Sequence, residues 1–327
     1  MKKEKWNKLR QEFPHQGFSI RTLAIWVCDA ALLALSFVCL SLGGWYLLLS
    51  WALLSLVLLH IYLFQHEATH NTIAKNRIIN DTIGHLFSWI IFVPYLARKR
   101  SHLLHHRYTG HPTLDPANKR AIDRFSVMTD ETAKKLDLIW KSWIPLLVVN
   151  DRVGLWLDPF QKTHVDYDHP KLKIERIYVR VYLALYLITA LLLFSFYSLS
   201  FVLLWYLPAL VVLLFIEELI NLPHHAETPL LETSDKPLHF SEQYAVSHSC
   251  EHIPFWSNFI LLNFNRHIPH HLFPWIAWYQ LPKLDEDIRQ HMNADVLNER
   301  TRNEIKWSLI NRKRSLLKIM GHYFDKR

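Results

Sequence analysis

The sequence is poor in cysteine and in glycine. Its 327 residues include three cysteines, Cys28, Cys39 and Cys250, and no two of them form a CxxC pair. This spacing argues against a disulfide framework and against a cysteine-ligated iron–sulfur cluster. Glycine occurs only seven times. A secretory signal peptide is not expected either, because the first 21 residues are polar and charged and the following apolar run lacks a small-residue cleavage site.

Acidic residues are outnumbered by basic ones. The chain has 37 Lys and Arg against 29 Asp and Glu, a net charge of +8 with histidine neutral. No zinc-finger spacing or aromatic–basic module accompanies this excess, so we expect no nucleic-acid partner. The basic residues gather at both ends of the chain and around Arg98-Lys99-Arg100. Such clusters are typical of a membrane protein whose cytosolic face is rich in Lys and Arg.

Long apolar runs are the first positive feature. Half of the residues are hydrophobic, and they concentrate in four runs of about 20 residues, long enough to cross a bilayer core as helices. These runs cover about residues 22–42, 45–64, 181–197 and 201–219. Gly43-Gly44 separates the first two, which indicates a tight turn. We therefore predict an all-α membrane protein whose four spans form two hairpins.

The remaining residues, 66–176 and 220–327, are more polar and are predicted to form a cytosolic helical cap, with the whole chain, 1–327, as one domain. Residues 78–96 are apolar but carry Asn80, Asp81 and Pro94, which favours a re-entrant or interfacial segment. Asp29 lies inside the first run. A charge within a span is usually paired or functional, but we expect Asp29 to lie near the cytosolic interface.

Histidine is over-represented, with 21 residues. Four groups stand out, each close to an apolar run: residues 66–70, 102–106, 224–225 and 267–271. Side chains at i, i+3 and i+4 share one face of a helix, so three of these groups each present two or three imidazoles to one point. Each group also follows an even number of spans, which places all four on one side of the membrane. About nine clustered imidazoles can hold two metal ions rather than one.

The first group, His66-Glu67-Ala68-Thr69-His70, matches the HExxH pattern of zinc peptidases, in which the glutamate is the general base. A zinc hydrolase needs one further protein ligand and an open position for water. This chain supplies seven more clustered histidines, which that mechanism does not require. Glu67 is therefore better interpreted as a carboxylate that accepts a hydrogen bond from a ligand histidine and fixes its tautomer.

The combination of HExxH, HxxHH and HxxHH motifs on two membrane hairpins resembles the integral-membrane fatty acid desaturase and hydroxylase superfamily. The resemblance extends over about residues 45–284 and is strengthened by several shorter motifs: His70-Asn71-Thr72, residues 77–84, His105-His106-Arg107-Tyr108-Thr109, Asp115-Pro116, Asn263-Phe264-Asn265 and Leu272-Phe273-Pro274. The final stretch is similar to bacterial acyl-lipid desaturases. Residues 221–224 and Trp278-Tyr279 are also similar to the carotenoid hydroxylase branch.

This resemblance implies two iron ions, with O₂ as cosubstrate, held mainly by imidazole. The ligands it implies are His66, His70, His102, His105, His106, His225, His267, His270 and His271. Asn221 would hold a metal-bound water, and His224 competes with His225 as the ligand after the fourth span. Among the other histidines, those without a partner at ligand spacing are expected outside the site: His85, His111, His164, His169, His239, His248 and His252. Asp115 is equally suited to orienting a ligand histidine or to capping the next helix.

The function that follows from the resemblance is insertion of a double bond into a fatty acyl chain. A hydroxylase or ketolase of carotenoid, sphingolipid or alkyl substrates is the main alternative. An HExxH membrane zinc peptidase and a histidine-rich metal carrier are weaker ones, the carrier because its ligands would be scattered through the spans. The chain has no electron carrier of its own, so we expect a separate donor, ferredoxin or cytochrome b5-like. A bacterial inner membrane, with the site facing the cytoplasm, is the expected location.

Overall fold

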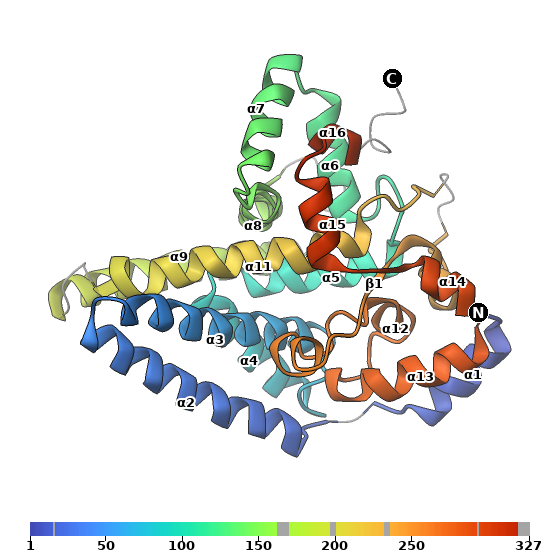
Figure 1. Ribbon diagram of the computed structural model, residues 1–327, viewed down its shortest axis with the longest axis horizontal. Coiled ribbons are helices and arrows are strands. Elements are labelled where there is room, and N and C mark those ends of the chain that lie inside the picture. The colour runs from blue at the N-terminus through green and yellow to red at the C-terminus, as the bar shows by residue number, and fades with distance from the viewer. Residues whose placement is uncertain (16, 162–169, 197–200, 232–235, 293, 320–327) are drawn as a thin grey trace.

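A computed structural model describes residues 1–15, 17–161, 170–196, 201–231, 236–292 and 294–319. Helices make up most of these residues. The strands within them are β1 (Ser249–Cys250) and β2 (Thr301–Arg302), which pair in parallel. Figure 1 shows the long helices running together towards one end of the molecule, whereas the N-terminus lies at the opposite end among shorter helices.

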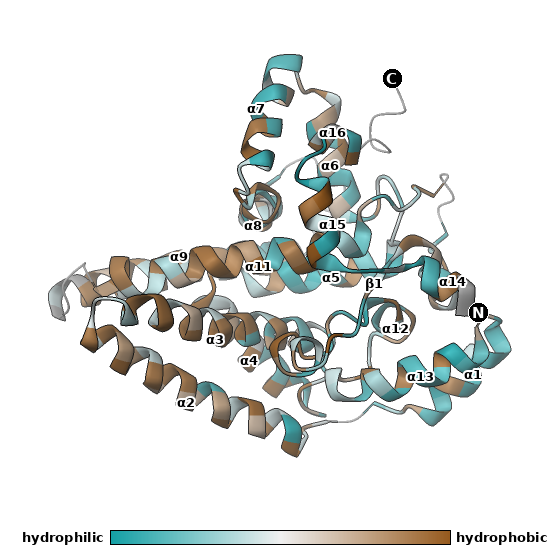
Figure 2. Ribbon diagram, viewed as in Figure 1, coloured by the Kyte–Doolittle hydropathy of each residue, from teal (hydrophilic) through white to brown (hydrophobic). Residues whose placement is uncertain are grey.

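Four helices in the described residues are long and apolar enough to cross a membrane. They are α2 (Ile20–Leu42), α3 (Tyr46–Thr69), α9 (Pro170–Phe196) and α11 (Leu207–His225), the last of which continues from the π-helical segment η2 (Val202–Tyr206). Figure 2 shows that most of the residues in these helices are hydrophobic. The prediction of an all-α membrane protein with four spans is thereby confirmed.

The ends of three spans differ from the prediction. Helix α3 continues past residue 64 to Thr69, α11 continues past residue 219 to His225, and α9 starts at Pro170 instead of residue 181. Backbone hydrogen bonding does not stop where hydropathy falls, so each helix extends from the apolar region into the polar cap. His66 and His225, which the sequence assigned to the cap, therefore lie on the spanning helices themselves. The predicted end of the third span, at residue 197, lies outside the described residues.

Helix α3 is the central span. In α3, 56% of the apolar stretch is buried inside the protein, against 22, 17 and 28% in α2, α9 and the fourth span. Side chains of α3 such as Leu58, Leu59 and Phe64 form the main hydrophobic core together with Leu213 of α11. The turn before α3 uses Gly43 and Gly44, both at positive φ (66° and 56°), a conformation that glycine adopts without strain. The other spans leave apolar side chains on the outside, as expected for helices that face lipid.

Short helices form the cap. Between the second and third spans lie α4 (Arg77–Ile90), α5 (Tyr95–Tyr108), α6 (Pro116–Ser126), α7 (Asp130–Lys141), α8 (Leu146–Leu157) and η1 (Asp158–Phe160). Before the first span lies α1 (Lys3–Glu12), and after the fourth lie η3 (Phe240–Val246), η4 (Trp256–Ile260), α12 (His267–Leu272), η5 (Trp278–Gln280), α13 (Leu281–His291), α14 (Ala294–Glu299), α15 (Glu304–Asn311) and α16 (Leu316–Ile319). The predicted re-entrant segment 78–96 is therefore one helix, α4, followed by the start of α5.

Asp29, the charged residue within the first span, is paired with a buried histidine. Its Oδ1 lies 2.6 Å from Nδ1 of His60, a fully buried residue of α3, and the Asp29 side chain is only 13% exposed. The other ring nitrogen of His60, Nε2, lies 2.9 Å from the carbonyl oxygen of Phe259 in η4. Because that carbonyl can only accept, Nε2 carries a proton. A second proton lies between Nδ1 of His60 and the carboxylate of Asp29. Through these two hydrogen bonds His60 connects α2, α3 and η4.

Candidate metal centre

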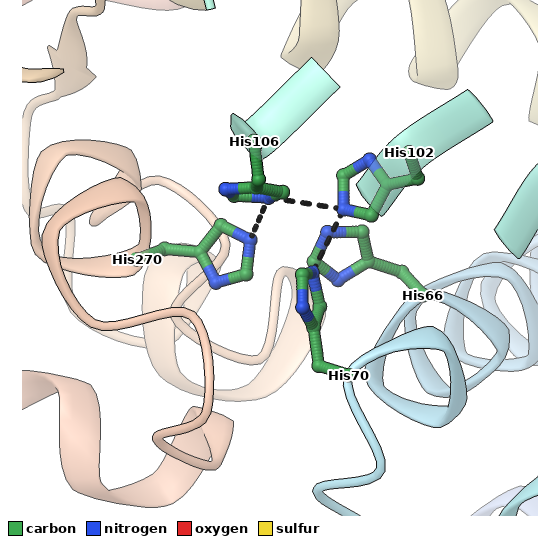
Figure 3. A group of neighbouring side chains, drawn as sticks. All are labelled: His66, His70, His102, His106 and His270. Carbon is green, nitrogen blue, oxygen red and sulfur yellow. Dashed lines mark hydrogen bonds between the residues drawn. The ribbon is translucent and has the colours of Figure 1, made fainter. Parts of the chain in front are cut away.

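All nine histidines predicted as ligands come together at the cap end of α3 and α11. Five of them form a first cluster, in which one ring nitrogen of each lies within 4.8 Å of the others: His66, His70, His102, His106 and His270. Figure 3 shows these rings pointing towards one another from α3, α5 and α12. Nε2 of His102 lies 2.8 Å from Nε2 of His70 and 3.2 Å from that of His106. We call this group the five-histidine cluster.

A second cluster lies directly beside the first. His105, His225 and His271 each offer a nitrogen within 4.8 Å of the others. His267 joins them, because its Nε2 lies 2.7 Å from Nε2 of His225 and 3.0 Å from that of His271. The rings of His106 and His271, one from each cluster, have centroids 4.3 Å apart. The two groups therefore form adjacent sites, and we call the second the four-histidine cluster.

Helical spacing explains how two motifs supply both clusters. In α5, His102 and His106 are four residues apart and point into the five-histidine cluster, while His105 points into the four-histidine cluster. In α12 the division is reversed: His267 and His271 share the four-histidine cluster, and His270 reaches the other. Positions i and i+4 lie on nearly the same face of a helix, whereas i+3 is rotated to one side. An HxxHH sequence can therefore bridge two neighbouring sites.

The candidate ligands lie in a dry environment. Burial lowers the pKa of His70, His102 and His106 well below the ordinary value of 6.5, and neighbouring histidines lower it further. The same two causes act on His267 and His271, and burial lowers the pKa of His270 to about 3. The rings are thus neutral at pH 7. A neutral imidazole has a lone pair on one nitrogen, which is the form that binds metal ions.

Two hydrogen-bond partners fix ring tautomers. Oδ2 of Asp115 accepts a hydrogen bond from Nδ1 of His105 at 2.9 Å, which leaves Nε2 of that ring as the lone-pair nitrogen. Oε1 of Gln243 lies 3.0 Å from Nδ1 of His271, while Nε2 of Gln243 donates to the carbonyl oxygen of His106. His271 therefore also has its proton on Nδ1. Partners of this kind orient a ligand and direct its bare nitrogen towards the metal.

Asp115 fulfils both roles that the sequence left open. Besides its contact with His105, its Oδ1 accepts a hydrogen bond from the N–H of Ala117 at 3.0 Å and so caps α6. Gln243 was not found by sequence reasoning. It lies in η3, 28 residues before His271, and no spacing rule connects it with the histidine motifs. Only the three-dimensional structure brings its amide to the site.

His224 and His225 have different environments. His225 belongs to the four-histidine cluster. The ring of His224 is instead stacked on that of His267, with centroids 4.1 Å apart and an interplanar angle of 8°, and both of its nitrogens are buried without a hydrogen-bond partner. The geometry therefore favours His225 as the ligand. His85, His111, His239, His248 and His252 lie outside both clusters, whereas His164 and His169 lie outside the described residues.

Glu67 does not make the predicted hydrogen bond to a ligand. Its Oε1 lies 3.8 Å from Nδ1 of His66, and its Oε2 accepts hydrogen bonds from Oγ1 of Thr72 at 2.8 Å and from the N–H of Trp278 at 3.0 Å. Consecutive residues on a helix point about 100° apart, so Glu67 is turned away from its neighbour's ring. The carboxylate instead connects the end of α3 with η5, just after the last histidine motif.

Asn221 lies one helical turn before His225, beside a cavity of about 230 Å³. Its Oδ1 accepts a hydrogen bond from the hydroxyl of Tyr62 at 3.2 Å, and its Nδ2 donates to the carbonyl oxygen of Glu217 at 2.7 Å. The cavity is bounded by Tyr62, Asn221 and His225, together with apolar side chains of α8 such as Leu147 and Leu155. It adjoins the four-histidine cluster through His225.

The two clusters fit metal ions better than they fit a set of hydrogen bonds. Each neutral imidazole has one proton, and His105 and His271 use theirs on Asp115 and Gln243. Nε2 of His66 is buried without any partner. None of the residues in either cluster is acidic. A metal cation bound by the converging lone pairs would give these ring nitrogens a partner. Imidazole is a good ligand for divalent first-row metals such as iron.

Comparison with known proteins gives a consistent result. Residues 10–303, which include all four histidine groups, match the family model described as fatty acid desaturase. The chain is 24% identical to the sn-1 oleoyl-lipid 12-desaturase of Anabaena variabilis, over 86% of this chain and 79% of that protein. It is 22% identical to the sn-1 oleoyl-lipid 12-desaturase of Arthrospira platensis, over 78% of this chain and 72% of that protein. It is also 24% identical to the sn-2 acyl-lipid omega-3 desaturase (ferredoxin), chloroplastic, of Helianthus annuus, over 81% of this chain and 61% of that protein.

Proposed function

This chain belongs to the fatty acid desaturase family, and on that basis we propose that it is an O₂-dependent di-iron lipid desaturase. The reaction would convert –CH₂–CH₂– of an acyl chain, with O₂, two electrons and two protons, into –CH=CH– and two molecules of water. The observation that carries this proposal is the pair of adjacent clusters made only of imidazole. Two metals side by side can be reduced by two electrons in total, which is the number that the reaction consumes.

The nine histidines would hold the two ions, five in one cluster and four in the other. Bound iron would supply the O₂ chemistry that removes hydrogen from an unactivated C–H bond. The task of the protein is to fix the ligands, exclude water and position one pair of methylene groups. Asp115 and Gln243 would hold two of the rings in the binding tautomer. Asn221, beside His225, would hold a water at the open position of the four-histidine cluster.

The cavity at His225 is the place where the acyl chain would react. Its lining includes His225 of the four-histidine cluster and residues of the spans α3 and α11. Leu147, Leu155 and Leu222 supply apolar surface for methylene groups, and Tyr62 and Asn221 border the end next to the metals. A lipid in the inner leaflet could reach this cavity without leaving the membrane. The relatives named above act on acyl lipids, which supports a membrane lipid as substrate.

The proposal includes a separate electron donor and a bacterial inner membrane with the cap in the cytoplasm. The excess of Lys and Arg around the cap supports this orientation. A relative whose name includes ferredoxin supports an iron–sulfur donor over one of the cytochrome b5 type. The zinc peptidase alternative is not supported, because the carboxylate of Glu67 is held by Thr72 and Trp278 and is unavailable as a general base.

The test is expression in a host with a simple lipid profile, followed by mass spectrometry of its lipids and metal analysis of the purified protein. We expect products two hydrogens lighter than the host lipids and about two irons per chain. His105→Ala should abolish the product, whereas His252→Ala, an exposed histidine outside both clusters, should retain it. A product heavier by one oxygen would indicate the hydroxylase or ketolase alternative. One zinc and no iron would refute the proposal.

A further inference from the structure

A second cavity reaches the metal centre at the five-histidine cluster. It has a volume of about 520 Å³ and is bounded by His70 and His106 of the five-histidine cluster. Leu103 and Arg107 of α5 and Lys3 of α1 line its outer part. The rings of two candidate ligands therefore form the inner wall of an opening on the protein surface. We call this opening the basic mouth and define it by Lys3, Leu103 and Arg107.

The position of the basic mouth does not suit a lipid chain. Lys3 belongs to α1, which Figure 1 shows at the end of the molecule opposite to the turn between α2 and α3. Figure 2 shows α1 as predominantly hydrophilic, in contrast to the spans. The cavity at His225, by contrast, is lined by span residues such as Tyr62 and Leu222. The two cavities therefore reach the metal centre from different elements, one beside α3, α8 and α11 and the other beside α1 and α5.

The electrostatics of the basic mouth are one-sided. Lys3 and Arg107 are exposed at its rim, and none of the described residues that line it is acidic. Helix α1 carries four basic residues and two glutamates, all exposed. Leu103, which lines the same cavity, is 42% exposed and adds an apolar side chain to its surface. A small apolar area surrounded by charges of one sign is typical of brief electron-transfer contacts, which are small and guided by electrostatics.

Helix α1 holds its charges in a fixed place. Trp6 donates from Nε1 to the carbonyl oxygen of Leu272 at 2.9 Å and stacks on Phe273, with ring centroids 5.5 Å apart. The terminal amine of Met1 donates to the carbonyl oxygen of Ser241 at 3.1 Å. The contacts of Trp6 join α1 to the end of α12, which carries His270 and His271, and the contact of Met1 joins the N-terminus to η3. The basic residues of α1 are therefore positioned relative to the metal ligands and do not form a mobile tail.

We propose that the basic mouth docks an acidic ferredoxin, which passes electrons to the metal centre through the edges of His70 and His106. The inference rests on the proposed function. Two reduced ferredoxins would each lose one electron and become oxidised. Together with two protons, these electrons complete the reduction of one O₂ to two waters, while the acyl chain loses two hydrogens. Leu103 would lie at the centre of the contact, and Lys3 and Arg107 would pair with carboxylates of the partner.

The experiment uses the full-length, iron-loaded protein with reduced plant-type ferredoxin and, separately, with dithionite, a small reductant that needs no docking surface. The test variant is Lys3→Glu/Arg107→Glu. The matched control is Lys306→Glu/Lys313→Glu, two exposed lysines in the C-terminal region, which changes the net charge by the same amount. We expect the test variant to need about tenfold more ferredoxin for half-maximal reduction of the metal centre, with a weaker dependence on salt. Reduction by dithionite and iron content should match the wild type.

A neutral variant, Lys3→Gln/Arg107→Gln, should fall between wild type and charge reversal. The proposal is overturned if charge reversal leaves ferredoxin reduction unchanged, or if the control variant impairs it equally. An equal loss with dithionite also overturns it, because the two residues would then support the metal centre itself. A change in acyl-lipid dependence alone would identify the mouth as a lipid entrance. A wild type that ferredoxin reduces but that forms no double bond would refute the proposed function and leave the docking surface supported.

Discussion

Asp115 contacts His105 and the first turn of α6 with different oxygen atoms. Oδ2 lies 2.9 Å from Nδ1 of His105, and Oδ1 lies 3.0 Å from the amide nitrogen of Ala117. The side chain is 1% exposed, so both contacts are shielded from water. One residue therefore fixes the tautomer of a candidate metal ligand and starts the helix that follows α5. The two roles can be separated by substitution.

Asp115→Asn should impair metal binding more than it impairs folding. An asparagine oxygen can still cap α6, but its amide donates and would turn the proton of His105 to Nε2, where the metal should bind. Loss of such a partner lowers metal affinity by about 10–100-fold. Asp115→Ala should in addition lose about 1 kcal/mol of stability with the cap. Iron content and thermal unfolding measure both effects. Asp123→Asn, an exposed position on α6, is the control, and full iron occupancy in Asp115→Asn would contradict the assigned role.

The Asp29–His60 pair should contribute to stability. Asp29→Leu removes the partner of a fully buried imidazole, and breaking a buried pair of this kind costs about 3 kcal/mol or more. The double variant Asp29→Leu/His60→Phe should be less destabilised than Asp29→Leu, because no polar ring is left without its partner. Thermal unfolding in detergent, with both single variants and the double variant, tests this coupling. Additive effects of the two substitutions would show that the pair does not act as a unit.

The sequence was sufficient to predict the four spans, because they are a local property, and the family resemblance pointed to the nine histidines that the structure brings together. A run of about 20 apolar residues predicts a span, and the spacing of i, i+3 and i+4 predicts a shared helix face. The partners of Asp29 and His271 were not predictable in this way. His60 and Gln243 are 31 and 28 residues away from them in the chain, and only packing of separate helices brings them together.

The assignment of each histidine to a cluster was equally beyond the sequence. His105 and His270 both occupy the i+3 position of an HxxHH motif, yet they belong to different clusters. The spacing shows that the i+3 ring diverges from the other two, but the direction of each helix decides which site it enters. Helix ends were misjudged for a related reason. Hydropathy marks the edge of the apolar region, whereas α3 continues to Thr69 through backbone hydrogen bonds.

His248 should make the protein sensitive to acid. Burial, reinforced by Arg302 and Arg300, lowers its pKa to about 3, while the unfolded chain retains the ordinary value near 6.5. Between these values the unfolded state binds the extra proton, so folding stability is complete above pH 6.5 and falls as the pH decreases. From pH 7.5 to 5.5 one such histidine accounts for about 1.4 kcal/mol.

The measurement for His248 is thermal unfolding of the iron-free protein at pH 7.5 and 5.5. His248→Leu should lose part of the acid sensitivity of the wild type, because the substituted side chain has no proton to bind. His15→Leu, at an exposed position, should keep the sensitivity of the wild type. An unchanged difference between the two pH values in His248→Leu would mean that other groups cause the acid response.

Leu147 provides a test of the cavity beside His225. Its side chain borders this cavity and also a neighbouring one of about 250 Å³ that extends towards α6, so it lies where the two meet. If an acyl chain occupies both, Leu147→Trp should obstruct the passage and lower turnover of long acyl chains by about tenfold or more, since a misplaced substrate loses most of its reactivity. Short acyl chains that end before Leu147 should be less affected, and iron content should not change.

Val149→Trp, at an exposed position of the same helix, should behave as the wild type. Equal losses for long and short chains would place the substrate elsewhere, because an obstruction within its path must depend on chain length.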